Sequence, residues 1–148
     1  MHYKLILSIF LSLLCASGLV GQGSAFIKNQ GQWDASVSHR FPLNNGDLWL
    51  DEGGWSLSVM HAEQREEALH ALHGEIGAST LVQGHVLKVR LKESQKPDNI
   101  QNSEERSAYH NYFIGNDKSK WQGHVPLFDR VQFSHIYAGI DLEVESEN

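Results

Sequence analysis

Histidine and acidic side chains offer the first candidate for chemistry, because the chain carries 9 histidines in 148 residues. Glu66, His70 and His73 stand at positions i, i+4 and i+7, so a helix would place them on one face. Imidazole and carboxylate groups arranged in this way can bind Zn²⁺, but the spacing supplies no fourth ligand. Histidines near the end of a surface helix are also common because they interact favourably with the helix dipole. We therefore expect no metal and no other cofactor.

Acidic turns and strand histidines are two further candidates. Asp47, Asp51 and Glu52 could offer oxygen ligands to Ca²⁺, but their spacing matches no known calcium-binding loop. We expect them to be solvated turn residues. His85 and His110 fall within strand patterns, where we expect buried, hydrogen-bonded side chains. The alternative, in which these two histidines form a site together, stays open.

Aromatic side chains could build a platform on which sugar rings stack. The residues concerned are Trp33, Trp49, Trp55, Trp121, Tyr109, Tyr112 and Tyr137. At the spacing of β-strands, aromatic side chains usually pack in the core instead. We expect the core role, with Trp33 and Trp121 as structural residues, and keep sugar binding as the alternative.

Sequence motifs for covalent or phosphate chemistry are absent. The sequence has no Gly-x-Ser-x-Gly elbow, and its only cysteine, Cys15, lies in an apolar N-terminal segment. Gly53 and Gly54 have the pattern of a turn between strands, not of a phosphate-binding loop. The formal net charge of -6 disfavours nucleic-acid binding, which needs a basic surface. We expect a protein that is not an enzyme and does not bind nucleic acid.

The first 25 residues have the order of features that is typical of a secretory signal peptide. Lys4 precedes an apolar run at 5–14, and small residues follow as far as Ala25. The apolar stretch is shorter than a membrane-spanning helix requires. We expect residues 1–25 to be cleaved and the mature chain to be secreted or at the cell surface, without a transmembrane helix. Suitable cleavage positions follow Gly18, Gly23 and Ala25.

Residues 26–148 alternate apolar and polar residues in the way that short antiparallel strands do. Turns are expected at 44–47 and 51–54, where Asn and Gly tolerate a positive φ. The pattern predicts a mainly β domain with an antiparallel, sandwich-like fold. The expected strands are 37–43, 48–50, 55–61, 83–91, 109–114, 125–128, 131–136 and 140–144.

Two segments depart from the strand pattern. In residues 62–73, Ala68, Leu69 and Leu72 share one side among charged residues, which predicts a short amphipathic helix. Residues 92–106 keep a single strongly apolar residue, Ile100, and are expected to form a long solvated loop.

Two stretches of the sequence resemble a group of known proteins. The first is Phe-Ile-Lys-Asn-Gln-Gly-Gln-Trp at 26–33, and the second begins as Tyr-His-Asn-Tyr-Phe-Ile-Gly-Asn-Asp at 109–117 and continues to 142. Over residues 26–148 the chain is similar to the N-terminal domain of large secreted Bacteroidota surface proteins. Such proteins carry SBBP (propeller-type) repeats or PKD-like modules and end in gliding-motility-associated or type IX secretion sorting tails. The motif residues are Asn29, Gly31, Trp33, Gly84, His85, Tyr109, Asn111, Tyr112, Gly115, Asn116, Trp121, Pro126, Tyr137, Gly139 and Asp141.

The chain departs from these relatives in a few places. Lys28, Gln30 and Ala138 replace the residues typical of the group. The expected last strand, at 140–144, is followed by no partner strand, so we expect the domain to be incomplete at its C-terminus.

The resemblance implies an exported, β-rich module with no assigned activity. We expect a structural or recognition role in a longer cell-surface protein, in adhesion or surface assembly. Its partners would be the downstream domains of the same protein and a cell-surface glycan or protein. The alternative is a carbohydrate-binding module of an exported hydrolase.

Overall fold

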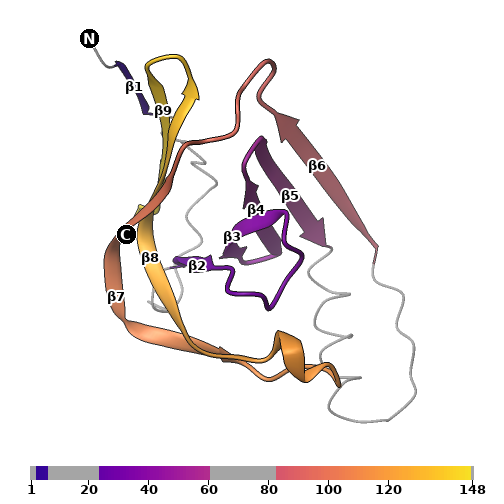
Figure 1. Cartoon of the computed structure of the whole chain (residues 1–148). Coiled ribbons are helices and arrows are strands. Elements are labelled where there is room, and N and C mark those ends of the chain that lie inside the picture. Colours follow the sequence, from indigo (N-terminus) through magenta and orange to yellow (C-terminus); the bar gives the residue numbers. More distant parts are fainter. Residues whose placement is uncertain (1–2, 7–23, 61–82, 148) are drawn as a thin grey trace.

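The computed structural model describes residues 3–6, 24–60 and 83–147, which form one nine-stranded sheet and a short 3₁₀ helix (Figure 1). The described residues include no helix that is long and apolar enough to cross a membrane. The elements are β1 (Tyr3–Ile6), β2 (Phe26–Lys28), β3 (Val37–Leu43), β4 (Gly46–Asp51), β5 (Gly54–Met60), β6 (Gly84–Arg90), β7 (Ile100–Tyr112), η1 (Lys118–Lys120), β8 (Gln122–Tyr137) and β9 (Ile140–Glu145).

The strand order along the sheet is β1-β9-β8-β2-β3-β4-β5-β6. Strand β7 lies outside this order and pairs with β8. Every pairing is antiparallel except that of β1 with β9. The prediction of a mainly β, antiparallel domain is therefore confirmed. The predicted helix at 62–73 lies outside the described residues.

The sheet curls so that its two ends face each other (Figure 1). Phe26 of β2 and Leu50 of β4 share one buried core with side chains of β8 and β9. Because residues from both halves of the curled sheet meet in this core, the packing is sandwich-like without two separate sheets. The β8 and β9 members are Val131, Phe133, Ile136, Leu142 and Val144.

A second, smaller core cluster lies beside β2. It consists of Ala25, Ile27, Val125 and Leu127, and Trp33, Ala108 and Tyr112 pack against it. Neighbouring residues of a strand point to opposite faces, so Phe26 enters the first core while Ile27 enters the second. The short strand β2 thus links the two clusters and the two halves of the sheet.

The meander β3–β4–β5 forms as the sequence predicts, but the reason given for its first turn is wrong. Asn44, Asn45 and Gly46 all have a negative φ, so the turn does not depend on left-handed backbone. Gly46 is needed because β5 approaches closely: a Cβ there would lie 1.8 Å from the carbonyl oxygen of Ser58.

The loop predicted at 92–106 is wrong in its second half, since β7 begins at Ile100 and continues to Tyr112. This strand pairs with β8 from Ile100–Phe133 to Tyr112–Gln122. Most of its side chains are polar and exposed. Backbone hydrogen bonds do not depend on side-chain polarity, so a strand at a sheet edge can lack the apolar alternation on which sequence reasoning relies.

The runs predicted at 125–128 and 131–136 are parts of the one long strand β8. Its pairing with β9 shifts register between Phe133 and Tyr137, and His124 and His135 each have a φ of 55°. Such irregularities bend a strand and interrupt its alternation, which explains why the sequence pattern divides it.

Strand β6 confirms the strand predicted at 83–91, but it is more exposed than its composition indicates. It is the last strand in the sheet order, and Val86 and Leu87 are 64% and 61% exposed. Its apolar residues therefore do not all mark the core.

Candidate functional site

The first motif folds into a loop that is held by the side chain of Asn29. The Asn29 amide oxygen accepts hydrogen bonds from the backbone N–H groups of Gly31 (3.0 Å) and Trp33 (3.3 Å). Its amide nitrogen donates to the carbonyl oxygens of Asp34 and Val37, both at 2.8 Å. Gly31 has a φ of 112°, a backbone conformation that favours glycine. This loop therefore fixes the backbone position from which the Trp33 side chain projects.

Replacing Asn29 with alanine should destabilise the domain by about 2 kcal/mol, because several backbone groups lose their partner at once. Urea unfolding followed by circular dichroism measures the effect. Asn29→Asp is the matched variant: it keeps the acceptor oxygen but turns a second acceptor oxygen toward the Asp34 and Val37 carbonyl oxygens, so it should be destabilised as well. An unchanged midpoint for Asn29→Ala would show that the loop does not depend on this side chain.

An aromatic cluster lies directly beyond this loop. The Trp33 ring meets Trp49 edge-on, at 5.4 Å and 90°, and meets Tyr112 at 5.3 Å and 74°. The guanidinium of Arg40 lies 5.9 Å from the Trp33 ring and 5.5 Å from the Trp49 ring, and it pairs with Asp47 at 2.7 Å. The two tryptophan rings are perpendicular and share a cation, so they do not present a flat stacking platform.

Tyr112 connects the aromatic cluster to a neighbouring hollow. Burial raises the pKa of Tyr112, and the nearby Arg40 opposes the rise. Its hydroxyl lies 3.3 Å from Nδ1 of His110, and the His110 ring lines the hollow. The phenol therefore stays neutral and available for hydrogen bonding at ordinary pH.

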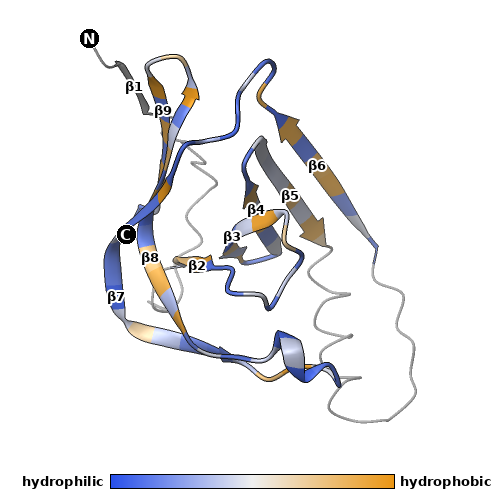
Figure 2. Cartoon of the chain, viewed as in Figure 1, coloured by the Kyte–Doolittle hydropathy of each residue, from blue (hydrophilic) through white to orange (hydrophobic). Residues whose placement is uncertain are grey.

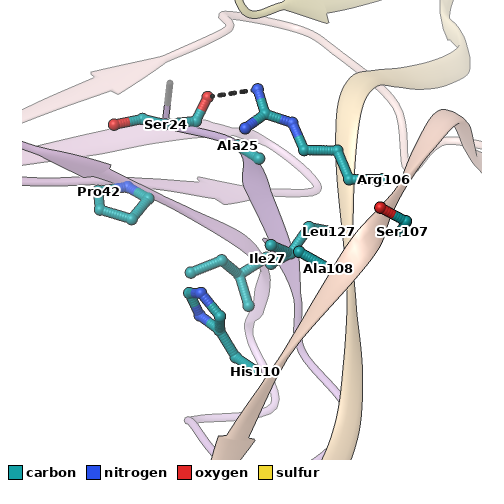
Figure 3. Close-up of a pocket in the computed structure, with 9 residues that line it drawn as sticks. All are labelled: Ser24, Ala25, Ile27, Pro42, Arg106, Ser107, Ala108, His110 and Leu127. Carbon is teal, nitrogen blue, oxygen red and sulfur yellow. Dashed lines mark hydrogen bonds between the residues drawn. The ribbon is translucent and has the colours of Figure 1, made fainter. Parts of the chain in front are cut away.

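A hollow of about 600 Å³ lies beside the second core cluster. Figure 3 shows His110 pointing into it toward Ile27, while Arg106 reaches toward Ser24 at the opposite end. Its lining residues come from β2 and its preceding residues, from β3, and from β7 and β8: Ser24, Ala25, Ile27, Pro42, Arg106, Ser107, Ala108, His110 and Leu127.

The guanidinium of Arg106, at the edge of this hollow, is paired with the carboxylate of Asp129. Arg106 donates to one carboxylate oxygen of Asp129 at 2.8 Å and 2.6 Å, and it also reaches the Ser24 carbonyl oxygen at 3.3 Å. The same Asp129 oxygen accepts from the Ser146 hydroxyl at 2.9 Å. Because Arg106 serves this network, the hollow suits an uncharged apolar group better than an anion.

Aromatic residues of the second motif lie on the far part of the β7–β8 hairpin, residues 109–124, which we call the arm. Tyr109 stacks on His124 with ring centres 3.8 Å apart and an angle of 17°. Phe113 meets Trp121 edge-on at 5.9 Å, and the Lys118 ammonium lies 5.6 Å from the Trp121 ring. Trp121 is 37% exposed, and Tyr109 and Phe113 are exposed as well. The core role expected for Tyr109 and Trp121 therefore does not describe their positions, whereas Tyr112 of the arm packs against the second core cluster.

The arm is held in shape by bonds within the second motif. The Trp121 indole N–H donates to the Gly115 carbonyl oxygen at 3.2 Å. The Asn111 amide oxygen accepts from the His124 backbone N–H at 3.0 Å. Asp117 accepts from the N–H and the hydroxyl of Ser119, and these bonds hold the pKa of Asp117 below its usual value.

The remaining motif residues occupy ordinary structural positions. Asn116 is exposed in the bend after β7, and Pro126 stands opposite Tyr109 in the β7–β8 pairing. Tyr137 donates to the Lys92 carbonyl oxygen at 2.8 Å, and Gly139 has a φ of 71° in the turn before β9. Asp141 accepts from the His135 backbone N–H at 2.8 Å.

Gly84 and His85, which are also motif residues, lie at the start of β6. A Cβ on Gly84 would lie 2.7 Å from the Val59 carbonyl oxygen, so glycine is needed for close strand pairing.

The expected burial of His85 and His110 is wrong, because both residues are exposed. They lie on β6 and β7, where their pairing partners are Val59 and Val125, so the structure does not join them in one site. His85 belongs to β6, whose apolar residues overstate its burial, and His110 belongs to β7, whose side chains are mostly polar and exposed.

The acidic turn residues pair with basic side chains. Asp51 meets Arg90 at 2.6 Å and Glu52 meets Lys96 at 3.3 Å, while Asp47 pairs with Arg40 as described above. The proposed zinc ligands Glu66, His70 and His73 lie outside the described residues. Within the described residues, no group of three or more metal-binding side chains comes together.

Among the described residues, His39 is a buried histidine that sequence reasoning did not single out. It is 2% exposed, and neither ring nitrogen has a hydrogen-bond partner among the described residues. Burial lowers the pKa of His39 to about 4, and the side chain of Asn102 opposes this shift. The only sequence signal was that His39 alternates in phase with Val37 and Phe41.

Comparison with known proteins gives one finding. A protein-family model described as Domain of unknown function (DUF7948) matches residues 26–148. Comparison with curated proteins and with solved structures gives no match. Because the family model covers most of the chain, this protein belongs to the DUF7948 family of domains of unknown function.

Proposed function

We propose that this chain is a non-catalytic recognition domain of an exported cell-surface protein, and that the arm is its contact surface. Export is supported by the signal-like order of Lys4, the apolar run at 5–14 and the small residues that follow. The resemblance to secreted Bacteroidota surface proteins, which covers residues 26–148, supports a surface role in a longer protein.

The observation that carries this proposal is the distribution of exposed apolar side chains. Among the described residues, the large exposed hydrophobic side chains form two groups, one on β5 and β6 and one on the arm. The arm group, Tyr109, Phe113, Ile114 and Trp121, comes from one hairpin whose shape is fixed by internal hydrogen bonds. Several exposed apolar side chains on one hairpin are typical of an interaction site.

A non-catalytic role is supported by the contacts of the polar groups around the hollow beside the second core cluster. Arg106 and Asp129 neutralise each other, and His110 contacts the Tyr112 hydroxyl. These contacts join β7, β8 and the residues before β2, so they serve the fold itself.

The geometry of the tryptophans favours recognition through the arm over a sugar platform on the sheet. Trp33 and Trp49 are perpendicular and both lie beside Arg40. A sugar-stacking platform needs open, coplanar ring faces, which this pair does not offer.

Binding of the purified chain to cell envelopes of a Bacteroidota species tests this proposal. We expect the wild-type chain to sediment with the envelopes and Phe113→Ser/Ile114→Ser to lose binding by about tenfold, because the arm would lose two of its exposed apolar side chains. The matched control is Val86→Ser/Leu87→Ser, which removes an exposed apolar pair on β6. Equal sedimentation of wild type and the arm variant would contradict the proposal, as would loss of binding in the β6 variant alone.

A further inference from the structure

The second group of exposed hydrophobic side chains lies on β5 and β6 and is not explained by the arm. Val86 and Leu87 of β6 are 64% and 61% exposed, and β6 stands at one end of the strand order. Figure 2 shows hydrophobic and hydrophilic residues along this strand. Among the described residues β6 pairs with β5 alone, so its other edge is open to a further strand.

The open edge of β6 presents a defined set of backbone groups. The Leu91 N–H, directly after β6, donates to the carbonyl oxygen of Gly53, directly before β5, at 3.0 Å. Hydrogen-bonded pairs alternate along antiparallel strands. The N–H groups of Val86, Lys88 and Arg90 therefore point away from β5, toward the open edge.

The outer edge of β9 is occupied by β1, which belongs to the signal-like segment. β1 pairs in parallel with Ile140–Glu143 of β9 (Figure 1). Apart from Ala25, both core clusters are built from residues 26–144, so a chain processed by export keeps its cores. Removal of residues 1–25 would therefore leave a folded domain whose β9 edge has lost the strand that fills it.

The backbone groups at this edge of β9 follow from its pairing with β8. The Ser146 N–H, directly after β9, donates to the Asp129 carbonyl oxygen of β8 at 2.9 Å. By the same alternation, the N–H groups of Asp141, Glu143 and Glu145 point away from β8. The processed chain would thus carry two open edges, one on β6 and one on β9.

Resting on the export proposed above, we propose that β6 of a second copy adds to the edge of β9 that processing frees, as an antiparallel strand. With Lys88 opposite Glu143, the outward N–H groups of the two strands stand in hydrogen-bonded pairs. The same register sets Arg90 opposite Asp141. Each basic side chain of β6 thereby meets an acidic side chain of β9.

The apolar faces of the two strands also match in this register. Leu87 stands opposite Val144, and Val89 stands opposite Leu142. Leu142 and Val144 belong to the first core cluster, and Leu87 lines a hollow together with Phe26 of that cluster. The joined sheet therefore keeps its apolar residues on one face and its charged pairs on the other.

The two edges remain opposite in charge when their existing ion pairs are counted. Arg90 is already paired with Asp51 at 2.6 Å, but Lys88 is exposed and forms no ion pair within the described residues. Beside β9, one guanidinium, that of Arg130, lies 3.1 to 3.8 Å from three carboxylates: those of Glu104, Glu143 and Glu145. An excess of negative charge therefore remains at β9 for the lysine of β6.

The two strands of one chain meet in a different way, which favours a second copy as the source of the added strand. Leu87 of β6 and Glu145 of β9 line one hollow of about 300 Å³. Within a chain, β6 and β9 therefore face each other across this hollow and are not joined edge to edge.

Analytical ultracentrifugation of the processed chain tests this inference. A bacterial host exports the chain, and its intact mass shows whether the N-terminal segment has been removed. We expect self-association at about 0.1 mM that weakens as salt rises from about 0.05 M to about 0.5 M. Lys88→Glu should weaken association about tenfold or more, because it sets two carboxylates opposite each other. Lys92→Glu is the matched control, since it makes the same change of net charge at an exposed residue outside β6.

Lys88→Pro and amide hydrogen exchange report the edge itself. Proline removes the N–H that points away from β5, so this variant should lose association while it stays folded by circular dichroism. In the wild type, the amides of Val86, Lys88 and Glu143 should gain protection when the copies associate.

A processed wild type that stays monomeric at about 0.1 mM would overturn the inference. Equal association of Lys88→Glu and Lys92→Glu would do the same, as would an exported chain that keeps its N-terminal segment. Phe113→Ser/Ile114→Ser should associate like wild type. If wild type is monomeric and this arm variant still loses envelope binding, the assembly is refuted while the contact role of the arm stands.

Discussion

Substituting Gly46 with alanine is expected to lower the free energy of unfolding by about 3 kcal/mol or more, as the most severe overpacked sites do. A Cβ at this position would lie 1.8 Å from the Ser58 carbonyl oxygen, 2.8 Å from its carbon and 3.1 Å from Cα of Val59. These are backbone atoms of β5, which cannot turn aside as a flexible side chain could. The β4–β5 pairing must therefore open, and with it the part of the core that Leu50 and Trp55 reach.

Gly53→Ala is the matched control for this substitution. Gly53 stands in the next turn, where a Cβ would meet only the Asp51 carboxylate oxygen at 3.7 Å, an ordinary contact. Its expected effect is within about 0.5 kcal/mol. Chemical unfolding of both variants, followed by tryptophan fluorescence, separates a steric cause from a general loss of glycine. Equal midpoints for the two variants would refute the close approach of β5 to Gly46.

Lowering the pH from about 7 to about 5 is expected to cost about 2 kcal/mol of stability through His39 alone. Burial lowers its pKa in the folded protein from 6.5 to about 4. Between these values the unfolded chain takes up a proton that the folded chain does not. Stability from this residue is therefore complete above about pH 6.5 and is lost as the pH falls toward 4.

His39→Phe should remove this part of the pH dependence. The ring nitrogens of His39 have no hydrogen-bond partner among the described residues, so the apolar ring breaks no such bond. Urea unfolding at about pH 7 and about pH 5 measures the difference between wild type and variant. His85→Phe, at an exposed position of β6, should keep the wild-type pH dependence. The burial of His39 would be refuted if wild type and His39→Phe lost equal stability over this range.

The sequence predicted best the strands that have one face in the core. Residues 37–43 form β3 with the bounds that the alternation gave, and β9 extends the predicted 140–144 by one residue. In β9, Leu142 and Val144 are buried while the alternating acidic residues Asp141, Glu143 and Glu145 are not. In a half-buried strand, apolar and polar residues alternate along the sequence, because one face meets the core and the other meets solvent.

The strands that the sequence pattern missed or divided lack this contrast between a buried and an exposed face. β7 has exposed polar residues on much of both faces, and its pairing with β8 rests on the backbone. In β8, a register shift and left-handed residues interrupt the alternation. No local pattern predicts such an edge strand or bulge, since both depend on the partner strand.

The candidate site, too, could be predicted from the sequence only in part. The two motifs, their aromatic residues and the glycines could be read from the sequence, and the sequence predicted structural roles for Trp33 and Trp121 alike. The structure places Trp33 against Trp49 and Tyr112 at the second core cluster, whereas Trp121 stands exposed on the arm.

By itself, the sequence determined the mainly β class, most strand positions and the signal-like N-terminus. Only the tertiary structure decided that His39 is buried while His85 and His110 are exposed, and that the arm carries exposed apolar groups. The physical reason is that burial depends on which segments the curled sheet brings together. His39 is covered because β3 faces Asn102 of β7 across the inside of the sheet, a contact between residues far apart in the chain.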